Sequence, residues 1–213
     1  MNPQYLGLIN NLIGEGYLKT PSIIEAFKAI DRADFVTDEY KENAYVNAPL
    51  PIGFRQTISQ PLTVAFMIEL LSPKEGQKIL EIGSGSGWQT AILSFIVSQN
   101  NAAGKIIGIE RLSELQEMAQ KNVSKYNFIE SGVAQVILAD GSKGYKKEVP
   151  FDKIIAGAAS SGDVPQAWKK QLKIGGRIVA PVDQSVVVIE KTEKDTFIKK
   201  EYFGFSFVPL VAE

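Results

Sequence analysis

Apolar and polar residues alternate along the chain in three different patterns. In the first third, apolar residues recur every three or four positions, which predicts amphipathic helices over about 4–14, from Pro21 onwards and over 61–71. Between 77 and 182, short apolar runs alternate with stretches of helical spacing. After that, β-branched and aromatic residues form short runs separated by turn residues, which predicts strands.

The middle part of the chain predicts alternating strands and helices. Its apolar runs are nearly continuous, and the connections are long enough to cross over a sheet, as in parallel sheets covered on both faces. The expected strands cover 77–82, 105–110, 134–139, 152–156 and 176–181, and the expected helices cover 87–98, 112–125 and about 164–172. Near the end, SVVVIEK, TFIKKEYF and SFVPL predict antiparallel strands. The sequence therefore predicts an α/β fold with a doubly wound, mostly parallel sheet, N-terminal helices and an antiparallel C-terminal strand addition.

The composition limits the chemistry that the chain can perform. Cysteine and histidine are both absent from its 213 residues, which excludes thiolate chemistry and Ser-His-Asp catalysis. We expect no metal site, and an enzyme of this composition would depend on a cofactor for difficult chemistry. The net charge of -1 argues against nucleic-acid partners, and no apolar run is long enough to span a membrane. The start of the chain lacks a basic signal-peptide region, so we expect a cytoplasmic protein.

The segment ILEIGSGSGWQTA (79–91) carries the strongest functional signal. A short apolar strand leads into Gly83, Gly85 and Gly87, and a helical pattern follows. A strand, a glycine loop and a helix N-terminus together present backbone N–H groups to a polar ligand, and glycine lets that ligand approach closely. A tight turn without a ligand is the alternative interpretation.

The spacing of the glycines distinguishes two classes of cofactor. The dinucleotide fingerprint G-x-G-x-x-G would need its third glycine where this chain has Trp88. The observed G-x-G-x-G, preceded by Glu81, resembles the first motif of class I S-adenosylmethionine-dependent methyltransferases. Glu110 ends the next strand, where its carboxylate could accept hydrogen bonds from both hydroxyls of a ribose or could face water. Asp140-Gly141 follows a third strand; it contacts adenine in the methyltransferase interpretation and is otherwise an ordinary turn.

Seven segments resemble the protein-L-isoaspartate O-methyltransferase family, in that family's order and over most of the chain. The glycine loop is common to many methyltransferases, whereas the TISQP segment and the FVPL ending are more specific. The segments are PLPIGFRQTISQP (49–61), ILEIGSGSGWQTA (79–91), GKIIGIER (104–111), ADGSKGY (139–145), VPFDKIIAGAA (149–159), VPQAWKKQLKIGGRIVAPV (164–182) and FVPL (207–210). The resemblance implies a Rossmann-like methyltransferase fold in one domain, 1–213. We expect an N-terminal helical and substrate-loop cap (1–75), a cofactor-binding core (76–182) and C-terminal antiparallel strands (183–213).

The resemblance also implies a reaction. A methyl group passes from S-adenosyl-L-methionine to the free α-carboxylate of L-isoaspartyl residues in damaged proteins and peptides, leaving S-adenosyl-L-homocysteine. The ester then promotes succinimide formation and a return towards normal aspartate. The carboxylate is already an anion at neutral pH, so no general base is needed, which agrees with the absence of histidine. We expect the protein to be a monomer.

Ser59 is the expected catalytic residue. It corresponds to the family's active-site serine, and we expect its hydroxyl to hydrogen-bond the substrate carboxylate and orient it rather than act as a nucleophile. A helix N-cap is an equally good interpretation of the same serine. Arg55 could attract a carboxylate, although a solvated loop residue is the simpler interpretation. The cofactor is expected to contact Gln56, Thr57, Ile58, Ser59, Glu81, Gly83, Gly85, Ser86, Gly87, Glu110, Asp140 and Gly141.

Three other functions compete with this one. A related carboxyl O-methyltransferase could act on an aspartate of a specific peptide, and the segments 43–60 and 158–163 would distinguish it. A non-catalytic nucleoside-binding protein could keep the pocket without turnover. An NAD-dependent oxidoreductase is disfavoured by the glycine spacing. The region 31–60 is long and irregular, and its Gly and Pro content leads us to expect that 43–60 closes over the ligand as a lid.

Overall fold

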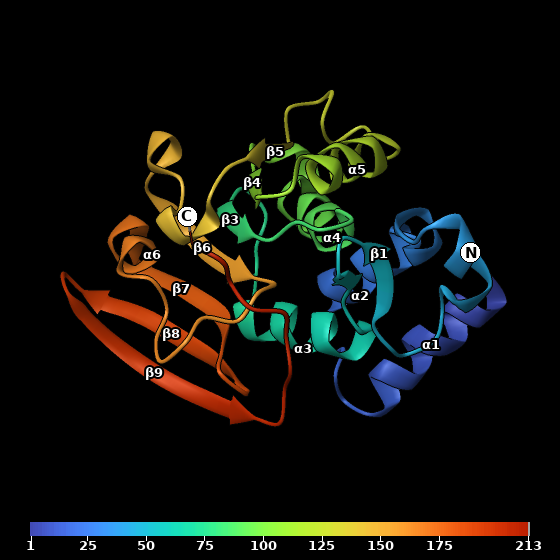
Figure 1. Ribbon diagram of the computed structural model, residues 1–213, viewed down its shortest axis with the longest axis horizontal. Helices are drawn as coiled ribbons and strands as arrows, with labels where there is room; N and C mark the ends of the chain where they lie inside the picture. Colours follow the sequence, from blue (N-terminus) through green and yellow to red (C-terminus); the bar gives the residue numbers. More distant parts are fainter. Residues whose placement is uncertain (213) are drawn as a thin grey trace.

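A seven-stranded sheet forms the centre of the molecule (Figure 1). The computed structural model describes residues 1–212. The strands are β3 (Lys78–Ile82), β4 (Lys105–Glu110), β5 (Ala134–Leu138), β6 (Phe151–Ala156), β7 (Leu172–Val182), β8 (Ser185–Glu193) and β9 (Thr196–Phe203). They lie in the order β5-β4-β3-β6-β7-β8-β9. The first five strands in this order are parallel, β8 pairs antiparallel with β7, and β9 pairs antiparallel with β8. The predicted mostly parallel sheet with its antiparallel addition is therefore confirmed.

Helices cover both faces of this sheet. They are α1 (Pro3–Gly14), α2 (Pro21–Ala29), α3 (Pro61–Leu71), α4 (Trp88–Val97), α5 (Ser113–Ser124) and α6 (Gln166–Gln171). Successive residues of a strand point to opposite faces. Ile79 and Ile155 accordingly join the hydrophobic cluster of α1 to α5, whereas Leu80 and Ile154 join the cluster on the side of α6. Burial on both faces explains why the central strands read as continuous apolar runs.

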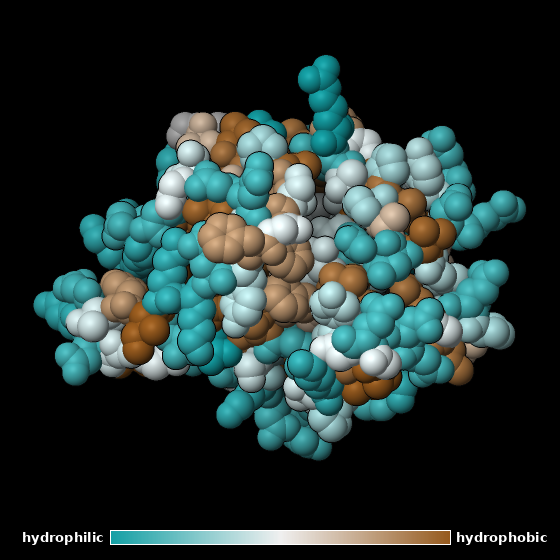
Figure 2. Space-filling view, turned by 90° about the horizontal axis from the view of Figure 1, so that it is seen from below, coloured by the Kyte–Doolittle hydropathy of each residue, from teal (hydrophilic) through white to brown (hydrophobic). Residues whose placement is uncertain are grey.

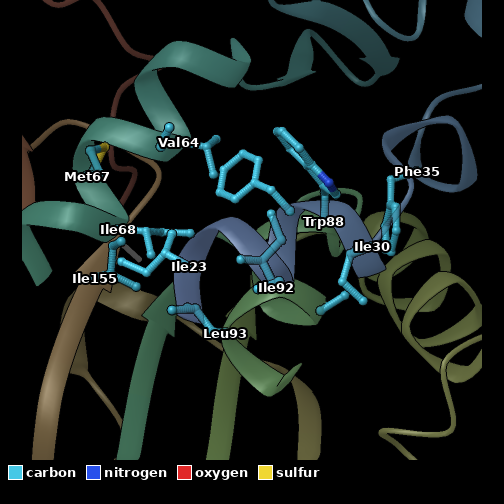
Figure 3. Packing of buried hydrophobic residues seen from close by; sticks show 14 of the residues in the cluster. Ile23, Ile30, Phe35, Val64, Met67, Ile68, Trp88, Ile92, Leu93 and Ile155 are labelled. Atoms are coloured by element: carbon cyan, nitrogen blue, oxygen red, sulfur yellow. The ribbon is translucent and has the colours of Figure 1, made fainter. Parts of the chain in front are cut away.

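Trp88 joins the N-terminal helices to the core (Figure 3). It is the first residue of α4, and only 2% of its surface is exposed. Its ring packs edge-on against Phe27 of α2, with the ring centroids 5.6 Å apart. Ile23, Val64 and Ile92, from three different helices, belong to the same cluster. This packing fixes the start of α4 and therefore the end of the glycine loop before it.

The region between α2 and α3 is more regular than predicted. It contains the short 3-10 helices η1 (Arg32–Phe35) and η2 (Asp38–Asn43), and a hairpin of β1 (Leu50–Gly53) and β2 (Gln56–Ile58). Phe54 and Arg55 form the hairpin turn, with φ of 52° and 57°. Asn-Gly or Asp-Gly would signal such a turn in a sequence, and Phe-Arg does not. The prediction of an irregular connection was therefore wrong for this part.

The end of the chain forms two of the three predicted antiparallel strands. Within the described residues, SFVPL is not a strand; Pro209 makes a single bridge with Ala159, just after β6. Proline has no N–H group, so it interrupts a ladder of hydrogen bonds. The segment instead exchanges two backbone hydrogen bonds with Ala159, which follows the carboxyl end of β6.

The described part of the chain includes no helix with the length and apolar character that crossing a bilayer requires. The division into a cap (1–75), a core (76–182) and C-terminal strands (183–213) stays a prediction.

Candidate functional site

A pocket of about 150 Å³ lies at the carboxyl end of the parallel strands. Its walls come from β2, the glycine loop, the ends of β4 and β6, and the segment that follows β9. The chain adds β4 and β5 on one side of β3, and β6 and β7 on the other side. The connections that follow β3 and β6 therefore run in opposite directions along the sheet. Such a switch point opens a crevice in which open α/β sheets bind their ligands.

The glycine loop is held at both ends. Gly83 donates its N–H to the Ile109 carbonyl at 2.8 Å, and Gly87 donates to the Ser84 carbonyl at 2.8 Å. Gly87 is also the N-cap of α4, with φ of 89°. A Cβ on Gly87 would lie 2.9 Å from the Val123 side chain and 3.0 Å from the Ala119 carbonyl oxygen. This glycine is therefore required for packing α4 against α5.

Glu81 belongs to the wall of this pocket and is fully buried. Gln89 donates a hydrogen bond to its carboxylate at 2.9 Å, and the hydroxyls of Thr90 and Ser84 donate to the other oxygen. Burial raises the pKa of the Glu81 carboxyl to about 7, and these three hydrogen bonds lower it in part. The carboxyl can therefore change its protonation state near neutral pH.

Glu110 fastens the glycine loop to the end of β4. One carboxylate oxygen accepts the Gly85 N–H at 3.0 Å, and the other accepts the N–H groups of Arg111 and Leu112 at 2.8 and 3.1 Å. Only 6% of the residue is exposed. The interpretation of Glu110 as a strand-end acid facing water is therefore wrong. A carboxylate oxygen has more than one acceptor site, so Glu110 can still bind ligand hydroxyls.

Asp140 and Gly141 differ in their position relative to the first pocket, because only Gly141 lines it. Gly141 lines the pocket, and a Cβ there would lie only 2.5 Å from the Ile82 side chain. The Asp140 carboxylate accepts the Ser142 N–H at 2.9 Å and pairs with Lys143 at 3.0 Å. Asp140 is not part of the pocket wall, so its predicted contact with a cofactor stays a prediction, as does that of Gly87.

Ser59 lies where two pockets meet. A second pocket of about 310 Å³ adjoins the first, and Ser59 belongs to both walls. Helix α3 begins at Pro61 with Gln60 as its N-cap, so the N-cap interpretation of Ser59 is wrong. Among residues 1–212 the Ser59 hydroxyl has no hydrogen-bond partner, and only its carbonyl is engaged.

The Arg32 side chain donates a hydrogen bond to the Ser59 carbonyl. Its buried guanidinium donates to the carbonyls of Ala44 at 2.7 Å and Ser59 at 3.1 Å, and it lies 5.3 Å from the centre of the Trp88 ring. It also donates to the carbonyls of Val46 and Ala48. Burial lowers the pKa of Arg32 to about 10. Arg32 therefore joins the loop between η2 and β1, the Ser59 segment and the start of α4.

Comparison with known proteins identifies the family. A family model described as protein-L-isoaspartate(D-aspartate) O-methyltransferase (PCMT) matches residues 4–213. The chain belongs to this family. A relative named protein-L-isoaspartate O-methyltransferase, from Methanopyrus kandleri, is 39% identical over 210 residues, which cover 97% of this chain and 90% of the relative. Protein-L-isoaspartate O-methyltransferase 2 from Archaeoglobus fulgidus is 43% identical over 194 residues, covering 90% and 85%.

Solved structures show that the fold of this family extends over the chain. A crystal structure from Plasmodium falciparum, described as a protein-L-isoaspartate O-methyltransferase in complex with S-adenosyl-L-homocysteine, matches with a TM-score of 0.86 at 23% identity. It covers 99% of both chains. Another protein-L-isoaspartate O-methyltransferase structure matches with a TM-score of 0.84 at 24% identity, covering 96% of this chain and 65% of the other. The predicted Rossmann-like methyltransferase fold is confirmed.

Within this family member, most of the predicted site residues share one pocket. Its wall includes Gln56, Thr57, Ile58, Ser59, Glu81, Gly83, Gly85, Ser86, Glu110 and Gly141. Arg55 lies exposed in the hairpin turn and outside this wall. Gly157, Ala158 and residues 208–211 also line the pocket, although they are not among the predicted cofactor contacts. The FVPL motif was a signal for the last group, but only the folded chain shows that it pairs with Ala159 after β6 and lines the pocket.

Proposed function

We propose that this protein transfers a methyl group from S-adenosyl-L-methionine to the free α-carboxylate of L-isoaspartyl residues in damaged proteins and peptides. The observation that carries the proposal is the shared wall of the two pockets, formed by Thr57, Ser59, Gly157 and Val208. A methyl donor in the first pocket and an acceptor in the second would meet at this wall. Methyl transfer needs such a meeting point, because the two reactants must be aligned at close range.

The residues of the first pocket suit S-adenosyl-L-methionine. The buried carboxyls of Glu81 and Glu110 provide acceptors for ribose hydroxyls and for positively charged groups. Gly141 forms a cradle that a Cβ would fill, since that atom would meet Ile82. When bound, the cofactor supplies a methyl group on a positively charged sulfur, which an acceptor carboxylate displaces to leave S-adenosyl-L-homocysteine.

Ser59 orients the acceptor carboxylate in this proposal. Its hydroxyl can donate to an incoming oxygen without breaking a hydrogen bond within the described residues. Arg32 fixes the backbone of Ser59 through its carbonyl. The acceptor is an anion at neutral pH, so no side chain has to remove a proton. Apolar wall residues such as Ile58 and Val64 exclude water from the meeting point.

Transfer of labelled methyl groups to matched peptides tests the function. The two peptides have the same sequence and differ only in carrying an isoaspartyl or a normal aspartyl residue. We expect labelling of the isoaspartyl peptide alone. Labelling of the aspartyl peptide would favour a related carboxyl O-methyltransferase, and cofactor binding without labelling of either peptide would favour a non-catalytic nucleoside-binding protein.

The variant Ser59→Ala tests the role of the hydroxyl. A hydrogen bond to a charged group contributes about 1.5–3 kcal/mol, so we expect kcat/KM for the isoaspartyl peptide to fall about 10- to 150-fold. The affinity for S-adenosyl-L-homocysteine, measured by calorimetry, should change little. Ser131→Ala, at an exposed position, is the control. Unchanged turnover of Ser59→Ala would show that the hydroxyl does not orient the acceptor.

The partners and location follow from the same proposal. The acceptors are isoaspartyl-containing proteins and peptides, and we expect a monomeric, cytoplasmic protein without nucleic-acid or membrane partners. The net charge of -1 supports the absence of a nucleic-acid partner. Light scattering of the purified protein measures the oligomeric state directly.

A further inference from the structure

A row of aromatic side chains lies on the surface beside the second pocket. Its members are half-buried and come from three separate parts of the chain: Tyr17, Phe66, Tyr202, Phe205 and Phe207. Seen from below, side chains of hydrophobic colour gather near the middle of the face, next to a hollow (Figure 2). Aromatic rings that keep part of their surface exposed beside a binding site are typical of recognition surfaces.

Ring-to-ring contacts hold this aromatic row in a defined arrangement. Phe66 of α3 stacks on Phe205, with centroids 5.1 Å apart and planes 13° apart. Tyr202 meets Phe66 edge-on at 5.4 Å, and Tyr17 does so at 6.4 Å. Phe205 and Phe207 follow one another at 6.4 Å. The rings are already positioned by one another, so a ligand that binds them would not have to order flexible side chains.

The aromatic row leads directly into the acceptor pocket. Phe207 belongs to the wall of the second pocket, together with Ser59. The other residues of that wall are uncharged: Pro49, Thr57, Gln60, Thr63, Gly157, Ser206 and Val208. A polypeptide whose isoaspartyl residue reaches Ser59 can therefore continue over Phe207 onto Phe205 and Phe66 without crossing a charged side chain of this wall.

We propose that the aromatic row binds an aromatic or large apolar side chain of the acceptor polypeptide, a few residues away from the isoaspartyl residue. The inference rests on the proposed function, because it assumes that the second pocket receives the acceptor. Side chains two residues apart in an extended chain are separated by about 6.5–7 Å, close to the ring spacings of the row. Phe207 shares the pocket wall with Ser59, and Phe205 lies 6.4 Å from Phe207, which is about two residues of extended chain. An extended acceptor would therefore reach Phe205 about three or four residues from the isoaspartate.

A set of three isoaspartyl peptides tests this inference with the wild-type protein. One is a tripeptide too short to reach Phe205, and the others are nine-residue peptides with either alanine or phenylalanine three and four residues from the isoaspartate, on both sides. An aromatic contact of this kind should lower KM for the phenylalanine peptide about 3- to 10-fold relative to the alanine peptide. Equal KM values for these two peptides would overturn the inference.

Two variants assign the effect to the row. Phe205→Ala should remove the advantage of the phenylalanine peptide, so that the two nine-residue peptides have equal KM values. Phe203→Ala is the matched control, since Phe203 is two positions away and 79% exposed. It should keep the advantage. If Phe205→Ala also keeps it, the row is not the binding surface.

The same measurements separate this inference from the proposed function. If the wild-type protein fails to methylate even the tripeptide, the proposed function fails. If it methylates the tripeptide and treats both longer peptides alike, only the role of the row fails. Light scattering at assay concentration shows whether a second copy of the chain covers the aromatic row. A dimer that Phe205→Ala dissociates would show that the row binds a second copy and not the acceptor peptide, and it would overturn the inference.

Discussion

Two groups beside the site that can carry a charge, Glu81 and Arg32, are 0% exposed, and neither is paired with an opposite charge in the contacts described. Glu81 is surrounded by neutral donors, and Arg32 donates to backbone carbonyls and faces the Trp88 ring. Burying such groups costs free energy that hydrogen bonds only partly offset. Each is therefore expected to reduce stability under some conditions while fixing the geometry of the site.

Glu81 should make the stability depend on pH. Its pKa of about 7 in the folded chain lies above the ordinary value of 4.5, so the folded state binds the proton more tightly. Its contribution to the free energy of unfolding is complete below pH 4.5 and is lost as pH rises through about 7, a change of about 3 kcal/mol. Glu81→Gln removes this titration. In urea denaturation, the difference in free energy of unfolding between the variant and the wild type should therefore shift in favour of the variant by about 2–3 kcal/mol from pH 5 to pH 8.

Glu39→Gln, at an exposed position, is the control for this comparison. It should follow the wild-type stability at both pH values. Parallel pH curves for the wild type and Glu81→Gln would show that the Glu81 carboxyl has an ordinary pKa.

Arg32→Met should lower the free energy of unfolding by about 3–5 kcal/mol. The change leaves the carbonyls of Ala44, Val46, Ala48 and Ser59 without their donor inside the protein. Arg32→Lys keeps one charge but not the fork of donors, so its loss should be smaller. Urea denaturation measures both, with the exposed Arg55→Met as the control. A loss below 1 kcal/mol for Arg32→Met would contradict this role.

At the scale of elements, the site depends on where helices and strands end. The carboxyl ends of β3, β4 and β6 form the pocket, and the start of α4 is fixed by Gly87 and Trp88. These ends were well predicted, because buried parallel strands and amphipathic helices leave regular apolar patterns. The β1–β2 hairpin was not, because its turn of Phe54 and Arg55 carries no local signal. Tertiary contacts determine its shape, among them those of Arg32 to the preceding loop.

Gly87→Ala should disturb the junction of α4 and α5. The residue has φ of 89°, and a Cβ would lie 2.9 Å from the Val123 side chain. The left-handed conformation and the overlap together should cost about 2–4 kcal/mol of stability. Gly7→Ala is the matched control, because Gly7 lies in α1 with no atom within 4 Å of an added Cβ. It should be neutral or gain up to about 1 kcal/mol in thermal or urea unfolding.

If Gly87→Ala unfolds at the same urea concentration as the wild type, the backbone must be able to move α4 away from α5. The interpretation of Gly87 as a packing residue would then be wrong.

At the scale of the whole molecule, the pocket gathers residues that are far apart in the chain. The glycine loop and Ser59 could be predicted because each carries its signal in a few consecutive residues. Residues 208–211 could not be placed, because their position depends on the bridge between Pro209 and Ala159. Residues 56–59 and 208–211 line the same pocket as the glycine loop, so a ligand there should hold distant segments together.

Binding of S-adenosyl-L-homocysteine should therefore stabilise the fold and protect these segments. At about 100 times its Kd the ligand should add about 2.7 kcal/mol to the free energy of unfolding. Hydrogen exchange should slow in 43–60 if that segment closes as a lid, while α1 should exchange as before. Exchange in 43–60 that is unaffected by the ligand would show that the segment is not a lid.

The wall shared by the two pockets limits how the protein can change its substrates. Thr57, Ser59, Gly157 and Val208 line both pockets, so in the proposed function a substitution that admits a new acceptor also alters the affinity for the methyl donor. Thr63 and Phe207 belong to the second pocket alone. In a directed-evolution experiment, new acceptor preferences should therefore accumulate first at Thr63 and Phe207, while the shared positions stay invariant unless two of them change together.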